Sequence, residues 1–518
     1  GDFPSGESIN PSIVAAPEQN IPKNERPLGK TPWRHHALIL VVFNIAILSL
    51  YHFLSYLLNP TLALLSVALF IVHPVGTQAV AWISALGYPL SLLWMCLSLN
   101  LTHYFYSLDS PSSLMYLGVY CLFFILQFLA INALFISICL WPVLFFLGYY
   151  PFAVISLIMS TLQGLKIVRE TISHRKSEFK KQNMGQFTVL RPRKWIVAMK
   201  TLYYYFKLSL FPRNMGLYHT WGFHCERGLE KEDKMLLAAL LSIGFVGWWF
   251  FVTPVFAVKF SIIWFLSFIF IFLNWITIQQ FVTERYVFVP TLGTCILIAY
   301  FTQSYFPVYM LIFGFYLMRT WCHLPTYDNE LKFYQSNVWN FPKSEVAYSN
   351  LGCTWLQIGL IGSTLDSWNI ATKLNPNYDV PYYNIHGHYK SNATLQMQHG
   401  NYGSAIELFK TAREFLAKAV ICEPCHFKDD WVKEIKKIDE WIANPTLMVR
   451  DEYTRLTQLK HDLDVMLAGE RNETRISEIT SSIRDNNARL EHIKSIPVTS
   501  LDSNTDPEMI YLRQTVKP

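Results

Sequence analysis

The sequence predicts an all-α protein, in which a polytopic bundle of transmembrane helices is followed by a soluble helical part. Three observations support this prediction. Of the 518 residues, 52% are hydrophobic and only 15% are charged, against roughly 25% charged residues in an average soluble domain. The first two-thirds repeats apolar stretches of about 17–25 residues, each long enough to cross roughly 30 Å of hydrocarbon. After Trp321 the pattern becomes that of amphipathic helices.

Eleven membrane spans are expected, and helix breakers inside them are tolerated only where protein or a cavity receives the freed backbone groups. A polar, proline-rich segment, residues 1–36, precedes them. Because it holds no apolar signal core, we expect that a targeting segment or a first helix has been removed. The expected spans cover approximately residues 37–58, 60–74, 86–107, 114–131, 133–149, 151–165, 196–212, 235–252, 255–280, 286–303 and 305–320.

A basic stretch at residues 166–194 holds nine Lys or Arg against two Glu. Such residues next to spans attract anionic lipid headgroups, and an interfacial helix that once handled a lipid phosphate is one interpretation. An ordinary loop that obeys the positive-inside rule is the other. The net charge of +6 is modest and clustered, so it indicates a membrane surface and no nucleic-acid partner.

The C-terminal part resembles tetratricopeptide repeats, in which small residues let two antiparallel helices approach and large residues fill the gap between them. One 34-residue repeat fits Glu345 to about Tyr378, and a second fits 386–417. The positions that should pack the helices are Gly352, Trp355, Trp368, Ala371, Pro376, Gly400, Ala405 and Ala412. The expected domains are a transmembrane domain at 37–321, a repeat-like helical domain at 322–445, a helical hairpin at 446–496 and an extended tail at 497–518.

A polar, helix-breaking knot interrupts the apolar sequence at residues 71–84, IVHPVGTQAVAWIS. His73, Pro74 and Gly76 break the apolar run, and two polar residues follow before the sequence turns apolar again. Because broken backbone inside a membrane must be buried in protein or face a cavity, such a knot is expected to line a site.

The knot belongs to a wider resemblance, which covers roughly residues 26–425. Its anchors are RPL at 26–28, HPVGTQAVAWIS at 73–84, YYYFKLSLFPRNMGLYH at 203–219, FVTERYVFVPTLG at 281–293 and the weaker 328–334. Together with the repeats, these motifs resemble the TMTC-type transmembrane O-mannosyltransferases, of the GT-C class of membrane glycosyltransferases. The resemblance implies transfer of mannose from dolichol-phosphate-mannose to Ser or Thr hydroxyls on the lumenal side. That chemistry needs a carboxylate to take the acceptor proton and cations or dipoles at the departing phosphate.

The charged residues that the resemblance implies are mostly missing here. Gly76 occupies the position where the resemblance implies a second His, and Gln78 the position of a Glu. Residues 85–89, where an Arg and an Asp are implied, and residues 131–133, where a Lys-Glu pair is implied, carry no charge. Intramembrane charges are costly and persist when function requires them. We therefore interpret the chain as a pseudoenzyme with a vestigial cavity. Its vestigial residues are His73, Gln78 and Arg285, whereas an active enzyme would depend on Asp2 and Glu284.

Cys422, Cys425 and His426 form a CxxCH pentapeptide, the attachment pattern of haem c. A disulfide in an oxidising compartment and inert or metal-binding thiols are the alternatives. We expect no other cofactor and no other metal site.

The sequence thus predicts a catalytically inactive accessory subunit of a larger membrane complex, with the repeat domain and the tail contacting other subunits. The mitochondrial inner membrane is the first expected setting, and the endoplasmic reticulum or a bacterial inner membrane are the alternatives. The second hypothesis is an active O-mannosyltransferase. A third, an electron-transfer subunit that carries haem c, depends on the CxxCH pentapeptide alone.

Overall fold

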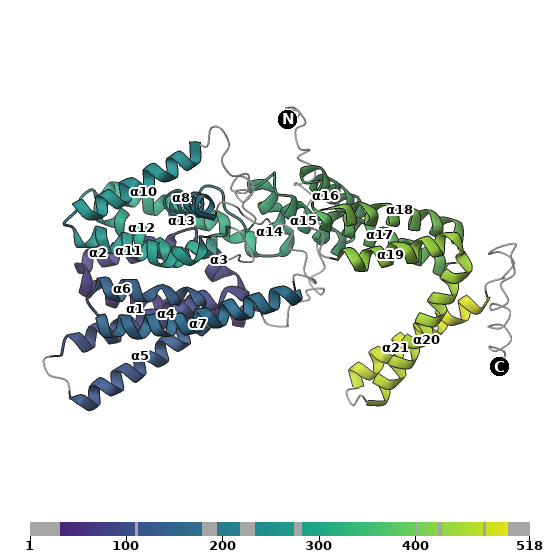
Figure 1. Cartoon of the computed structure of the whole chain (residues 1–518), viewed down its shortest axis with the longest axis horizontal. Helices are drawn as coiled ribbons and strands as arrows, with labels where there is room; N and C mark the ends of the chain where they lie inside the picture. Colours follow the sequence, from purple (N-terminus) through teal and green to yellow (C-terminus); the bar gives the residue numbers. More distant parts are fainter. Residues whose placement is uncertain are drawn as a thin grey trace. The chain divides into compact units, whose positions relative to one another are not determined.

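A computed structural model of the chain (Figure 1) describes residues 32–108, 112–178, 194–217, 234–273, 282–399, 401–422, 427–469 and 473–495. Over these ranges the chain forms helices and no strand, so the all-α prediction is confirmed. The described residues divide into two compact units, one ending at Thr364 and the other beginning at Leu365.

The first unit contains the apolar helices and the beginning of the polar C-terminal part. Its longer helices are α1 (Pro32–Leu57), α2 (Pro60–Val72), α4 (Gly87–Tyr106), α5 (Ser113–Ala133), α7 (Tyr150–Glu178), α8 (Lys194–Leu210), α10 (Lys234–Val252), α11 (Phe256–Ile269), α12 (Glu284–Thr302), α13 (Phe306–His323), α14 (Glu330–Asn340) and α15 (Glu345–Gln357). Its short helical segments are α3 (Gly76–Ala81), η2 (Ile83–Ala85), η3 (Phe135–Leu140), α6 (Trp141–Phe146), η4 (Phe270–Phe272) and η5 (Leu324–Tyr327).

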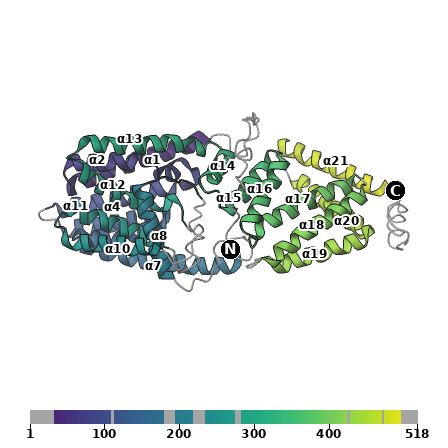
Figure 2. The same ribbon diagram turned by 90° about the horizontal axis from the view of Figure 1, so that it is seen from above.

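The second unit is a series of amphipathic helices, which Figure 2 shows from above. The boundary between the units falls within α16 (Ile361–Leu374), and the further helices are α17 (Asp379–Gln398), α18 (Tyr402–Ile421), α19 (Lys428–Ala443), α20 (Pro445–Gly469) and α21 (Glu473–Ser495). α17, α18 and α19 pack in sequence order, and α20 packs against α21. In that last pair Asn486 Nδ2 donates to the Leu456 carbonyl at 2.8 Å.

Local sequence explains where several helices begin. The Asn59 side chain accepts from Leu62 N at 2.7 Å and Pro60 follows as the first helical residue of α2, a combination that suits a helix N-terminus because proline has no N–H to satisfy. Ser112 caps α5 in the same way, and Ser344 caps α15. Thr283, at the N-cap position of α12, makes no such side-chain bond. The start of α12 must therefore be satisfied from elsewhere.

Helices lie at the places of the predicted spans, but their lengths differ. Four are long and apolar enough to cross a membrane, namely Trp33–Leu57, Ile83–Tyr106, Ser113–Ala133 and Glu284–Thr302. α2 has 13 residues, which gives it a length of roughly 20 Å at 1.5 Å per residue. Four candidate spans therefore follow from length and composition in the described part of the chain, and the larger number of eleven stays a prediction.

The stretch 133–149, expected as one span, is broken into η3 and α6. Cys139 has non-helical backbone angles, and Pro142 lies at the start of α6. Since proline lacks an N–H and clashes with the preceding turn, it starts a helix more easily than it continues one. Gly148, with φ of 81°, follows the end of α6. α7 is longer than the span expected at 151–165, because it continues through part of the basic stretch to Glu178.

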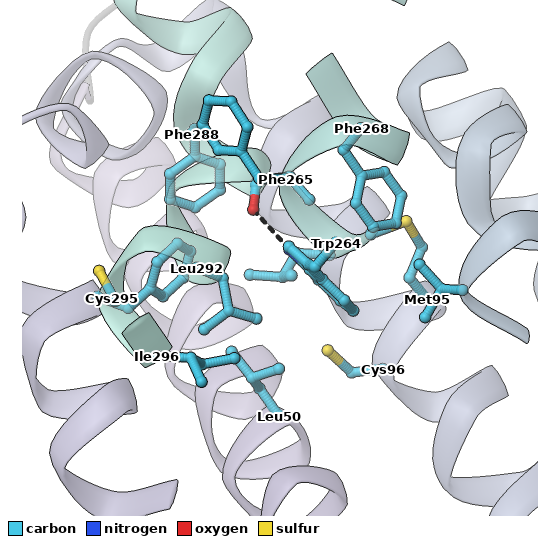
Figure 3. Close-up of a cluster of buried hydrophobic side chains, with 14 of the residues drawn as sticks. Leu50, Met95, Cys96, Trp264, Phe265, Phe268, Phe288, Leu292, Cys295 and Ile296 are labelled. Atoms are coloured by element: carbon cyan, nitrogen blue, oxygen red, sulfur yellow. Dashed lines mark hydrogen bonds between the residues drawn. The ribbon is translucent and has the colours of Figure 1, made fainter. Parts of the chain in front are cut away.

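One large apolar core holds the first unit together (Figure 3). Trp264 is fully buried in α11, and its indole N–H donates to the Val289 carbonyl of α12 at 2.9 Å. The two helix backbones lie close together at Gly293, where an added Cβ would lie 2.4 Å from the Ser261 carbonyl oxygen. Glycine is required there because no side chain fits between the two backbones.

Candidate functional site

The knot at residues 71–84 folds into a tight turn followed by a short helix. α2 ends at Val72, and Pro74 restricts the residue before it to extended backbone, as observed for His73 with ψ of 124°. α3 then spans Gly76–Ala81, and Trp82 returns to extended backbone with ψ of 117°. The turn carries buried polar side chains inward instead of continuing an apolar helix.

His73 is bound on both ring nitrogens. Its Nδ1 lies 3.3 Å from the Val75 backbone N–H and accepts from it, so Nε2 carries the proton and donates to the Ser209 carbonyl at 2.9 Å. The centroid of the ring lies 4.5 Å from that of Tyr316. His73 therefore ties the end of α2 to the end of α8 and to the middle of α13. The bonds found for it do not join it to the other polar residues of the predicted vestigial cavity.

Gln78 satisfies the start of α12. Its Oε1 accepts from Thr283 Oγ1 at 2.8 Å and from the Arg285 backbone N–H at 2.9 Å. These groups belong to the first turn of a helix whose N-cap residue supplies no side-chain bond, so Gln78 acts as the cap from α3, more than 200 residues earlier. The Gln78 side chain is fully buried, and its Nε2 has no hydrogen-bond partner among the described residues.

Glu284, the first residue of α12, is also fully buried. Its Oε1 accepts from the Gly216 backbone N–H, and its Oε2 lies 3.5 Å from His323 Nε2 at the end of α13. A carboxylate at this position also interacts favourably with the positive end of the α12 dipole. Glu284, the acid of the ERY motif, is thus held by a backbone donor, an imidazole and a helix terminus.

Gly216 and Leu217 form a strap after α8 that two buried side chains hold. Leu217 N donates to Asn337 Oδ1 of α14 at 2.6 Å, next to the bond between Gly216 and Glu284. A Cβ at residue 216 would lie 2.7 Å from the same Asn337 oxygen and 2.9 Å from the Phe341 ring. A glycine is required because the strap passes so close to α14.

Arg285 faces aromatic rings. Its guanidinium lies 5.3 Å from the centroid of Trp82 and 5.7 Å from that of Tyr286, within the range of cation–π attraction. Tyr327 in η5 lies next to His323, with its ring centroid 5.4 Å from that of His323. Burial, and then the charge of Glu284, raise the pKa of the Tyr327 hydroxyl well above its usual value.

Parts of three anchors therefore converge on the start of α12: the knot, the strap of Gly216 and Leu217, and the ERY motif. Sequence analysis named Gln78, Glu284 and Arg285 but missed His323 and Asn337. The strap glycine lay within a quoted motif, whereas Asn337 and His323 gave no signal beyond being polar residues next to apolar ones. In the described part of the chain no cluster of three or more His, Cys, Asp or Glu could hold a metal ion.

Several predicted site residues fall elsewhere. Asp2, Gly400, Cys425 and His426 lie outside the described residues, as does the tail at 497–518. Cys422 is buried at the end of α18, with Sγ 3.4 Å from the Lys418 carbonyl oxygen. The choice between haem, disulfide and inert thiols therefore stays a prediction. Of the proposed repeat positions, Trp355, Trp368, Ala371, Ala405 and Ala412 are buried, Gly352 is also buried, and Pro376 is exposed.

The second unit contains a further polar cluster that sequence analysis missed. Glu434 of α19 bonds Lys390 and lies 3.3 Å from His386 Nε2, while His386 Nδ1 donates to the Ala412 carbonyl at 2.9 Å. The hydrogen bond to His386, followed by that to Lys390, lowers the pKa of Glu434 to about 2. The cluster lies in a groove of about 840 Å³, which Lys433, Lys437 and Arg455 also line.

Comparison with known proteins adds no relative. No protein-family model matches the sequence, and no curated protein and no solved structure matches the chain.

Proposed function

We propose that the chain is a catalytically inactive, TMTC-like membrane scaffold that serves as an accessory subunit of a larger membrane complex. The observation that carries this proposal is the bonding of Gln78. At the position where the resemblance implies a catalytic Glu, the amide oxygen is used to cap α12 through Thr283 and Arg285. An amide keeps the shape and the acceptor of a carboxylate but cannot take a proton from an acceptor hydroxyl.

The bonding of Glu284 supports the same proposal. A general base must reach the proton that it abstracts, but this carboxylate is fully buried and contacts the Gly216 N–H and His323. Its contacts join α12, α13 and the strap, which is a structural task. The inherited polar site is, in this proposal, retained because it fastens three segments of the first unit together.

The second unit offers the surface for partners. Its groove carries Lys390, Lys433, Lys437 and Arg455 around a single lining carboxylate, Glu434, so it favours an acidic segment of another subunit. We propose that the helices from α15 to α18 form two tetratricopeptide repeats, because the predicted packing tryptophans and alanines are buried. The proposed setting is the mitochondrial inner membrane, and cofractionation with markers of that membrane or of the endoplasmic reticulum tests it.

The test is the native mass of the full chain, tagged and extracted in mild detergent from its own cells. We expect migration far above 60.2 kDa with partners in fixed ratio. Lys433→Glu reverses a charge in the groove and should release at least one partner. Lys410→Glu is the matched control, because Lys410 lies outside the groove and, like Lys433, pairs with an acid three residues earlier. Equal loss from both variants would remove the argument for the groove.

The enzyme hypothesis predicts different results. An active O-mannosyltransferase should transfer mannose from dolichol-phosphate-mannose to a Ser/Thr peptide and lose that activity on Glu284→Gln, which keeps the acceptor for Gly216 N. A lone monomer or dimer with this activity would contradict the scaffold proposal. A Soret band that survives denaturation would instead support haem attached at Cys422 and Cys425.

A further inference from the structure

An apolar cavity of about 410 Å³ lies in the first unit between α8, α10, α11 and α12. None of the residues that line it belongs to the polar site described above. Its lining is dominated by apolar side chains, including Phe206, Phe245, Trp249, Ile262, Phe265 and Leu297. Phe265 is among the side chains drawn in Figure 3. Because apolar side chains dominate the lining, the cavity suits the apolar portion of a ligand.

Four residues bring hydroxyls to the lining, namely Tyr203, Ser242, Ser261 and Thr294, and two of these hydroxyls bond within their own helices. Ser261 donates to the Ala257 carbonyl at 2.7 Å, and Thr294 donates to the Thr291 carbonyl at 2.8 Å. Both donors are thus satisfied within their own helices. Gly247 of α10 also lines the cavity, and an added Cβ there would have no heavy atom within 4 Å. The space next to Gly247 is therefore open, and a larger side chain would project into it.

A lysine lies at one end of this cavity. Lys259 is a charged residue in the otherwise apolar α11, and it precedes the lining residues Ile262 and Ile263 by three and four positions, which places it on the same helix face. Its Nζ lies 5.7 Å from the ring centroid of Phe250, another lining residue. Among the described residues it forms no ion pair. Its side chain is half-buried, and a charge beside apolar surface is stabilised by an anionic partner.

We propose that the cavity holds one acyl chain of an anionic phospholipid, whose phosphate pairs with the Lys259 ammonium. The apolar lining accounts for the chain, and the lysine at the rim accounts for the headgroup charge. A transmembrane helix of another subunit is about 10 Å across and roughly 30 Å long, so it occupies several times the volume of the cavity. The proposal rests on the membrane location proposed above but not on the scaffold role.

The test uses the full chain, purified in mild detergent and reconstituted in nanodiscs of phosphatidylcholine and phosphatidylglycerol in equal amounts. Native mass spectrometry then identifies the lipids that stay bound. Gly247→Leu fills the cavity. Gly244→Leu is its matched control, because Gly244 lies one turn earlier in α10, does not line the cavity and has equally open space at its Cβ. We expect a retained phosphatidylglycerol in the wild type and in Gly244→Leu, and its loss in Gly247→Leu.

The charge is tested separately. Lys259→Met keeps an unbranched side chain and removes the charge. It should lower the ratio of retained phosphatidylglycerol to phosphatidylcholine about fivefold, which corresponds to roughly 1 kcal/mol per lysine near an anionic surface. Lys207→Met, at an exposed lysine of α8 that does not line the cavity, should leave the ratio unchanged. Equal retention in both glycine variants, an unchanged ratio in Lys259→Met, or a bound polyisoprenoid would overturn the proposal. A chain that stays soluble without detergent would instead refute the membrane location.

Discussion

Gln78 and Thr283, 205 positions apart, are joined by a hydrogen bond of 2.8 Å that places the cap of α12 on another helix. The bond links the polar knot of the sequence to the ERY motif. The knot therefore has a structural role that does not depend on catalysis, because the first N–H groups of a helix require acceptors when they are buried.

Replacing Gln78 with Ala should destabilise the first unit. The change leaves the Thr283 hydroxyl and the Arg285 N–H without their acceptor, at a cost of about 1–3 kcal/mol for a buried unsatisfied group. Thermal unfolding of the full chain in detergent, followed by tryptophan fluorescence, should show a lower midpoint than the wild type. Gln303→Ala is the control, since Gln303 lies at the other end of α12 and, among the described residues, its side chain bonds its own helix. Equal shifts in both variants would contradict a capping role for Gln78.

Replacing Gly216 with Ala should also destabilise the first unit. The new methyl group would lie 2.7 Å from Asn337 Oδ1 and 2.9 Å from the Phe341 ring, and overpacking of this kind costs typically about 1–3 kcal/mol. Gly118→Ala in α5, where nothing lies within 4 Å of the added Cβ, is the matched control. Thermal unfolding should separate the two, and a wild-type midpoint for Gly216→Ala would show that the strap moves freely away from α14.

Acid should weaken the second unit through Glu434. The pKa of this carboxyl is lowered to about 2 in the folded chain, chiefly by His386, from an ordinary value of 4.5. The stability it contributes is therefore complete above about pH 4.5 and is lost as the pH falls toward 2. The unfolding midpoint of Glu434→Gln should depend less on pH across this window than that of the wild type. Glu440→Gln, at an exposed residue of α19, should retain the wild-type dependence.

Asp379 should give the stability of the second unit the opposite dependence on pH. This residue is buried at the start of α17, and its Oδ2 has no hydrogen-bond partner among the described residues. Burial raises the pKa of the carboxyl from 3.8 to about 6. The folded chain therefore binds the proton more tightly than the unfolded chain, and stability is lost as the pH rises from about 4 to about 6.

Asp379→Asn should remove this loss, because the amide is neutral at every pH. At pH 7 its unfolding midpoint should equal or exceed that of the wild type, and the slope between pH 4 and 6 should be smaller. Asp366→Asn, at an exposed residue of α16, serves as the control and should keep the wild-type slope. A lower midpoint of Asp379→Asn at pH 7 would mean that the ionised carboxylate stabilises the start of α17.

The sequence by itself determined the helical class of this protein and the places of most of its helices. Hydrophobic period, caps such as Asn59 and breakers such as Pro142 act within a few residues, so they can be read locally. The expected span at 133–149 nevertheless did not take the break at Pro142 into account. The sequence also marked Gln78, Glu284 and Arg285 as a polar group out of place in an apolar chain.

Only the tertiary structure decided what those residues contact. The sequence grouped His73 with Gln78, but His73 bonds Ser209 and packs on Tyr316, whereas Gln78 bonds the start of α12. Asn337 and His323 lie far along the chain from their partners Leu217 and Glu284. The same is true of Lys390 and Glu434. Such contacts depend on how helices pack, and neither period nor spacing encodes the partner of a buried polar side chain, because any acceptor that the packing brings within reach can satisfy it.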